Sequence, residues 1–185
     1  RDRSPSRGLG DVYKRQLEAN VLAAIQLQVE AALDYDKLLD KLRGSEGEKN
    51  IRDQQNALIT SLNLRLNGVS KKRTRLYEDY AEGLLDEAEY SFAKKSYDEQ
   101  YADLSRRLDE AVQRRSKFDE AMSVDNKWIT LMKSVSTATQ LSQDLVDESV
   151  ELVKVHEGGA VELIMKYGDI YELTIQSIKE VQEAM

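Results

Sequence analysis

The chain has 185 residues, and its 34 acidic and 27 basic side chains give a net charge of −7, which argues against autonomous binding to a phosphate backbone. It contains no Cys and one His, which excludes a disulfide framework and a cysteine or histidine cluster for a metal, so no cofactor is expected. No apolar run approaches the roughly 20 residues that span a bilayer, and we expect a soluble, cytoplasmic protein without a membrane partner.

Residues 1–16, RDRSPSRGLGDVYKRQ, lack hydrophobic periodicity and contain the single Pro. They resemble the translated adapter scars found at the ends of assembled reading frames, and we leave them out of the fold prediction. The alternative is a genuine flexible basic arm. In either case we expect the natural protein to begin further upstream.

Apolar residues then recur at spacings of three and four, which predicts an amphipathic helix over residues 17–43. The expected buried face consists of Leu17, Val21, Ala24, Ile25, Gln28, Val29, Ala32, Leu38, Leu39 and Leu42. The two glycines of the following segment, residues 44–47, favour a loop.

A long antiparallel coiled-coil hairpin is predicted over residues 51–122, because two helices joined by a short connection pack side by side. Its first helix has a seam with a spacing near 3.5 residues, made of Ile51, Leu58, Leu62, Leu66, Val69, Leu76 and Tyr80. The return helix has a more regular seam, made of Tyr90, Lys94, Tyr97, Tyr101, Leu104, Leu108, Ala111, Arg115, Phe118 and Met122. At about 1.5 Å per residue the return helix extends about 54 Å, which predicts a projecting rod.

The turn of this hairpin is predicted near residues 83–86. Gly83 suits the left-handed position that follows a helix C-terminus. Asp86 and Glu89 have the spacing of a capping box, and Leu85 can pack on Tyr90 as a hydrophobic staple. One of Leu84 and Leu85 is expected to face solvent.

A small α+β unit is predicted over residues 124–185, with helices at about 126–135, 143–151 and 170–183 and a β-hairpin at about 152–167. Trp128, Ile129 and Met132 mark the first helix, and Ser142 caps the second. Alternating residues around Gly158-Gly159 predict the hairpin, including Tyr167 in its second strand. The terminal helix is expected to pack on the hairpin through Tyr171, Leu173, Ile175, Ile178 and Val181. The predicted fold is therefore mostly α.

Two stretches resemble the C-terminal region of large serine site-specific recombinases of the phage-integrase and mobile-element type. LYEDYAEGLLDEAEYSFAKKSYDEQYADLSRRL, residues 76–108, is similar to the tip and return arm of that family's coiled coil. LSQDLVDESVELVKVHEGGAVELIMKY, residues 141–167, is similar to its helix and terminal hairpin. Their order and separation also match, and the resemblance covers residues 17–171.

The resemblance implies a parent protein that recombines DNA through a serine-nucleophile domain, with a zinc ribbon that reads the attachment site. Those parts have no counterpart in this chain, so it carries no catalytic or metal residue over and is not itself an enzyme. The residues that carry over lie at the coiled-coil tip, through which family members contact other subunits: Tyr77, Tyr80, Gly83, Leu84, Leu85 and Tyr90. The implied partners are other recombinase subunits, a directionality factor, and DNA through the parent protein.

Charged groups elsewhere have simpler explanations than binding sites. Lys71, Lys72, Arg73 and Arg75 are expected to form a solvated helix face rather than a phosphate site. His156 has no second ligand nearby in the sequence, which argues against catalysis or metal binding. The alternative to a recombinase fragment is a free-standing coiled-coil interaction protein that would start close to Leu17.

Overall fold

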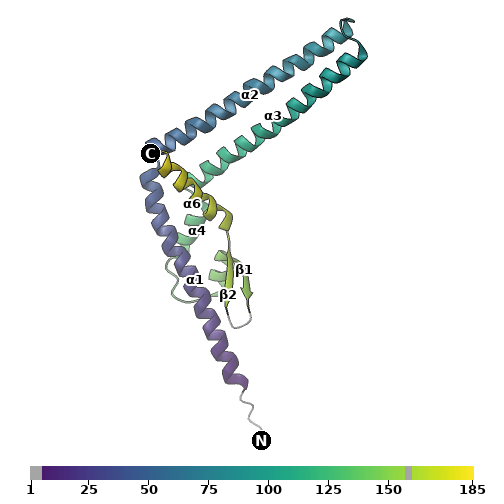
Figure 1. Cartoon of the computed structure of the whole chain (residues 1–185). Helices are drawn as coiled ribbons and strands as arrows, with labels where there is room; N and C mark the ends of the chain where they lie inside the picture. The colour runs from purple at the N-terminus through teal and green to yellow at the C-terminus, as the bar shows by residue number, and fades with distance from the viewer. Residues whose placement is uncertain (1–5, 157–159) are drawn as a thin grey trace.

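A computed structural model of the chain describes residues 6–156 and 160–185, with side chains from residue 12 onward. The helices are α1 (Ser6–Leu42), α2 (Glu46–Ala81), α3 (Glu87–Met122), α4 (Lys127–Ser134), α5 (Gln143–Ser149) and α6 (Gly168–Glu183), and the strands are β1 (Val150–Val155) and β2 (Val161–Met165). Figure 1 shows α2 and α3 as an antiparallel rod that projects from a body made of the other elements. The predicted mostly α fold, with a coiled-coil hairpin and a small α+β unit, is confirmed.

The two parts have separate apolar cores. In the rod, the seam side chains of Leu62, Val69, Leu104 and Ala111 are buried between the helices. In the body, Trp128 and Met132 of α4 are fully buried beside α1 and α6. Complete burial of a large apolar side chain stabilises a fold by roughly 1.5–3 kcal/mol, so α4 is held in the body by packing despite its eight residues.

Helix α1 has the predicted buried face but begins earlier than predicted. Six of the ten expected residues are buried and the other four are half-buried. The helix starts at Ser6 rather than Leu17, so it includes most of the segment that lacks periodicity. No proline interrupts residues 6–17, and adding a residue to an existing helix costs far less than nucleating a new one. Figure 1 shows this first part of α1 extending beyond the body.

The start of α2 corrects the predicted loop at residues 44–47 and the start at Ile51. Ser45 is the N-cap, and its side chain accepts a hydrogen bond from the backbone N–H of Glu48 at 3.2 Å. Gly47 therefore lies inside the first helical turn, where it is buried. A β-carbon at Gly47 would lie 2.3 Å from the carbonyl oxygen of Val181, so this glycine lets α6 approach α2 closely.

The β-hairpin follows α5 directly, with its strands antiparallel and Val153 opposite Leu163. Tyr167 was predicted in the second strand, but the strand ends at Met165. Tyr167 instead adopts a left-handed conformation, with φ of 58°, immediately before α6. This residue links the extended strand to the first turn of α6, and its positive φ bends the backbone between them. The predicted Gly158-Gly159 turn lies outside the described residues.

Helix α6 packs mainly on other helices, which corrects the expectation that it covers the hairpin. It contacts α3, α2, α1 and α4, and its buried side chains include Ile178 and Val181. The hairpin packs instead on α1 through β2. Periodicity identifies a buried face but not what covers it, and the base of the rod offers α6 a second helical surface.

Candidate functional site

The coiled-coil tip is a hydrogen-bonded turn, and its backbone conformation is the one predicted from the sequence. Gly83 has φ of +76°, as predicted for the left-handed residue after α2. Its N–H donates to the Tyr80 carbonyl at 3.0 Å, and the Leu84 N–H donates to the Asp79 carbonyl at 2.9 Å. This pair of bonds defines a Schellman motif, which satisfies carbonyl groups that the helix end would otherwise leave free.

The return helix starts at the predicted capping box. The Asp86 side chain accepts from the Glu89 N–H at 2.8 Å, while the Glu89 side chain accepts from the Asp86 N–H at 3.0 Å. The predicted staple paired Leu85 with Tyr90. Both are half-buried, and the Tyr90 ring stacks on Tyr80 with 4.3 Å between centroids and 17° between planes. The tip is therefore fixed by two caps and an aromatic stack.

The residues carried over from the family resemblance divide into supporting and exposed groups. Tyr80, Gly83, Leu85 and Tyr90 shape the turn, whereas Tyr77 and Leu84 are 62% and 67% exposed. Of the two leucines, Leu84 is the one that faces solvent. An exposed leucine and tyrosine at the end of a rod offer apolar contact area to another protein.

Phe92 is a further exposed apolar residue that the sequence analysis missed, with 81% of its surface accessible. It lies two residues after Tyr90 in α3, about 200° around the helix, and so points away from α2. This off-seam position was the signal that could have identified it. An exposed phenylalanine beside a turn strengthens the case that the tip binds protein.

The tip is also strongly acidic. Residues 76–93 contain six Asp and Glu side chains and no Lys, Arg or His. Just below, Arg73 forms an ion pair with Asp98 at 2.8 Å and lies over the Tyr101 ring at 4.8 Å. Part of the basic cluster therefore ties α2 to α3, and its neighbours Lys71 and Lys72 are exposed.

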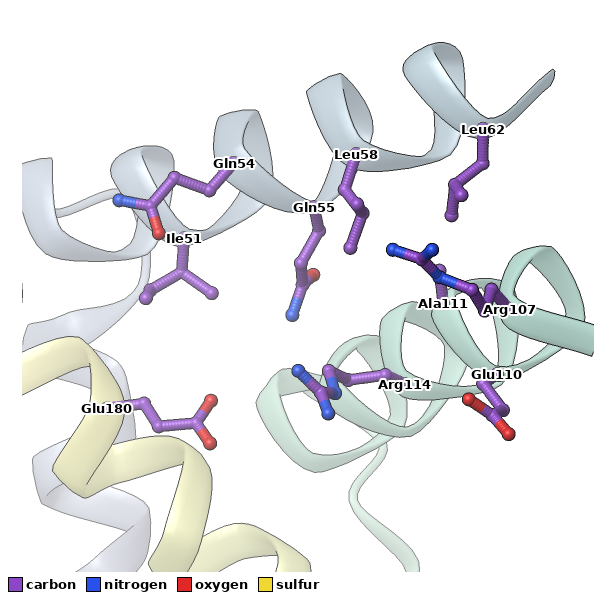
Figure 2. A pocket seen from close by; sticks show the side chains of 10 residues that line it. All are labelled: Ile51, Gln54, Gln55, Leu58, Leu62, Arg107, Glu110, Ala111, Arg114 and Glu180. Carbon is purple, nitrogen blue, oxygen red and sulfur yellow. The ribbon is translucent and has the colours of Figure 1, made fainter. Parts of the chain in front are cut away.

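A second surface feature is a groove at the other end of the rod, where α2 and α3 meet α6. It has a volume of about 390 Å³ and is shown in Figure 2. Its lining residues are Ile51, Gln54, Gln55, Leu58, Leu62, Arg107, Glu110, Ala111, Arg114 and Glu180. A neighbouring depression continues it along α3 to Lys117 and Phe118.

Charged side chains join α2 to α3 at the base of the rod. Arg52 of α2 forms an ion pair with Asp119 of α3, whose other oxygen accepts from Arg115 at 2.9 Å. Arg115 also donates to the side-chain oxygen of Asn56 at 3.1 Å. Arg43, which follows α1, donates to the Met122 carbonyl at 2.9 Å. The start of α2 and the end of α3 are thereby joined to each other and to the residue that follows α1.

A further group of charged side chains lies on the surface of the β-hairpin. Glu162 accepts from Lys154 at 3.1 Å, and its second oxygen lies 3.2 Å from His156. The hydrogen bond from Lys154, with a smaller effect of His156, lowers the pKa of Glu162 below its ordinary value. Within residues 6–156 and 160–185, no group of three His, Asp or Glu side chains could hold a metal ion. No helix in the same ranges is long and apolar enough to cross a membrane.

The tip geometry thus supports contacts with protein. Searches against protein-family models, curated proteins and solved structures find no match to this chain.

Proposed function

We propose that this chain is the C-terminal part of a serine site-specific DNA recombinase and that its coiled-coil tip makes contacts between subunits during synapsis. The catalytic serine domain and the zinc ribbon belong to the parent protein, which acts in the cytoplasm. The proposal rests on the resemblance of residues 76–108 and 141–167 to that family. This chain contributes the contact between subunits and the regulation of that contact, whereas the recombination of DNA is carried out by the catalytic domain.

The observation that carries the contact role is the exposure of apolar side chains on a rigid tip. Tyr77, Leu84 and Phe92 are each more than 60% exposed at the far end of a rod. A pre-organised turn loses little conformational freedom on binding, so even a small contact of this kind can contribute affinity. A contact of this size is weak alone and strengthens once subunits are held together on DNA.

The role of the tip is tested by Leu84→Asp in the parent recombinase. We expect the helicity of the chain to stay unchanged, because Leu84 is exposed, and synapsis to fall by about tenfold or more, because a buried carboxylate disfavours the contact. The measurement is the yield of synaptic complex and of recombinant DNA.

Leu64→Asp is the matched control, since Leu64 lies on α2 away from the tip and is 68% exposed, against 67% for Leu84. Normal synapsis by the Leu84→Asp recombinase would contradict the contact role. The wider proposal is tested by reading the gene upstream of Leu17. A serine-nucleophile domain and paired cysteines are expected there, and a start codon close to Leu17 would favour the free-standing interaction protein instead.

A further inference from the structure

The groove at the base of the rod combines an apolar floor with a polar group that lacks a partner. Ile51, Leu58, Leu62 and Ala111 supply the floor. The side-chain oxygen of Gln55 is buried and accepts no hydrogen bond from the described residues. A buried acceptor without a donor is unfavourable, so an occupant that brings an O–H or N–H group is favoured there.

Positive charge lines the α3 side of this groove. Figure 2 shows the side chains of Arg107 and Arg114 extending from α3 into the groove. Lys117 lines its continuation toward α6. Within the described part of the chain, Arg114 and Lys117 form no ion pair, and the nearest carboxylate to Arg107 is that of Asp103 at 3.8 Å.

The two carboxylates in the groove wall differ in how far their charge is offset. Glu110 forms an ion pair with Arg106 at 2.7 Å, whereas Glu180 accepts a hydrogen bond at 2.9 Å from the neutral amide of Gln176 and keeps its charge. Arg114 and Lys117 together outnumber Glu180, so the groove keeps an excess of positive charge. An apolar floor beside this excess suits an occupant that is both apolar and acidic.

The tip of the rod has that chemistry. It presents Leu84 to solvent beside six carboxylates without any basic side chain between Arg75 and Lys94. The exposed Tyr77 carries a hydroxyl group that can donate to the Gln55 oxygen once the Gln55 side chain turns that oxygen into the groove. We propose that the tip of a second copy of this chain docks in the basal groove. This inference rests on the proposed contact role of the tip and names the surface that receives it.

The occupant must come from another copy because tip and groove lie at opposite ends of one rod. Residues 58 and 82 are separated by about 36 Å along α2, at about 1.5 Å per residue. Two rods packed antiparallel place each tip at the groove of the other, which gives two equal contacts related by a two-fold axis. Because the second contact forms within the complex, each reinforces the other.

Disulfide trapping tests this arrangement in the full chain, which has no native Cys. Ala88→Cys places a thiol at the tip, and Gln54→Cys places one in the groove, without changing Leu84, Arg114 or Lys117. The control is Asn67→Cys, at an exposed position of α2 that does not line the groove. The chain with the tip thiol and the chain with the groove or control thiol differ in size, so that each disulfide-linked pair can be identified. The two chains are mixed in low salt, oxidised and separated by electrophoresis.

The expected result is that the tip thiol joins the Gln54→Cys thiol at least about tenfold faster than the Asn67→Cys thiol. If the tip thiols join mainly each other, the groove is not the receptor and the inference fails, while the proposed contact role of the tip stands. If the tip thiol reacts no faster than the control with any partner, both fail.

Charge reversal gives an independent test with the same thiols. Arg114→Glu with Lys117→Glu makes the groove acidic. Glu78→Arg, Asp79→Arg, Glu82→Arg and Glu87→Arg together change the net charge of residues 76–93 from −6 to +2 and leave the capping pair Asp86 and Glu89 intact. All of these positions are exposed except the half-buried Asp79. Each variant alone should lose the tip-to-groove disulfide, and a mixture of the two should regain it, because tip and groove are again opposite in charge. Circular dichroism of each variant confirms that it is folded. Failure of the mixture to regain the disulfide, with both variants folded, overturns the inference.

Discussion

At the scale of single residues, Asn126 organises the junction between the rod and the body. Its side chain is fully buried, donates to the Ala121 carbonyl at 3.0 Å and to the Thr174 hydroxyl at 2.8 Å, and accepts from the Ile129 N–H at 3.1 Å. It therefore caps α4 while linking the end of α3 to α6. A buried amide with all these bonds satisfied fixes one arrangement of the three helices.

We predict that Asn126→Ala lowers the free energy of unfolding by about 2–4 kcal/mol, because it removes a helix cap and leaves buried polar groups without partners. Chemical denaturation followed by circular dichroism measures the change. The control is Ser142→Ala, which removes the α5 cap at an exposed position and should cost about 1 kcal/mol. Equal losses in the two variants would contradict the special role of Asn126.

At the scale of secondary-structure elements, the crossing of α2 and α6 depends on a glycine, which has no side chain to separate the two helices. Gly47 lies under Val181, whose carbonyl oxygen would be 2.3 Å from an added β-carbon. Gly68, in the interior of the same helix, has no atom within 4 Å of the corresponding position. The two glycines thus allow the effect of close packing to be separated from the effect of helix propensity.

We predict that Gly47→Ala destabilises the chain by about 1–3 kcal/mol, as expected for overpacking. Gly68→Ala should instead stabilise it by about 0.5–1 kcal/mol, because alanine favours the helix. Thermal unfolding of the two variants measures both changes. A stabilising Gly47→Ala substitution would show that α6 does not pack against this turn.

Long helices could be predicted from the sequence, because the spacing of three and four residues between buried positions repeats many times along them. The buried faces of α1 and α3 are of this kind, whereas the caps at Gly83 and Asp86 could be predicted from residue types at the turn itself. The start of α2 was missed although Ser45 and Glu48 have capping-box spacing, because the glycines on either side of Ser45 favoured a loop. The partners of α6 could not be predicted, because they depend on packing between distant segments.

The candidate functional surfaces could be predicted only in part, for a similar reason. The turn at the tip follows from local residue types, and the family resemblance pointed to the residues around it, apart from Phe92. The groove draws its lining from α2, α3 and α6, and no local pattern joins Leu58 to Arg114 and Glu180. It becomes visible only when the three helices are placed in space.

At the scale of the whole molecule, ion pairs at the base of the rod hold its two helices together where α6 packs against them. Asp119 binds Arg52 across the rod and Arg115 on its own helix. Asp103 also pairs with two arginines, Arg106 and Arg107, but all three residues belong to α3. Only the first group holds α2 against α3 where they leave the body.

We predict that Asp119→Ala widens the distribution of rod directions, because two neighbouring guanidinium groups lose their shared counter-charge. Pulsed electron–electron spin resonance measures this, with labels at Ala88→Cys on the tip and Lys37→Cys on α1. Asp103→Ala is the control and should leave the distance distribution unchanged. Equal widths in Asp119→Ala and the unsubstituted chain would show that packing alone sets the direction.

The hydrogen bond from Arg43 to the carbonyl of Met122 brings together the points where the chain enters and leaves the rod. The chain therefore enters and leaves the rod at one place, and residues 46–122 form an insertion whose base packs on α6. Removing one heptad from each helix would draw the tip in by about 10 Å and leave the seam in register. The length of the rod can thus change while its seam and its two ends stay as they are.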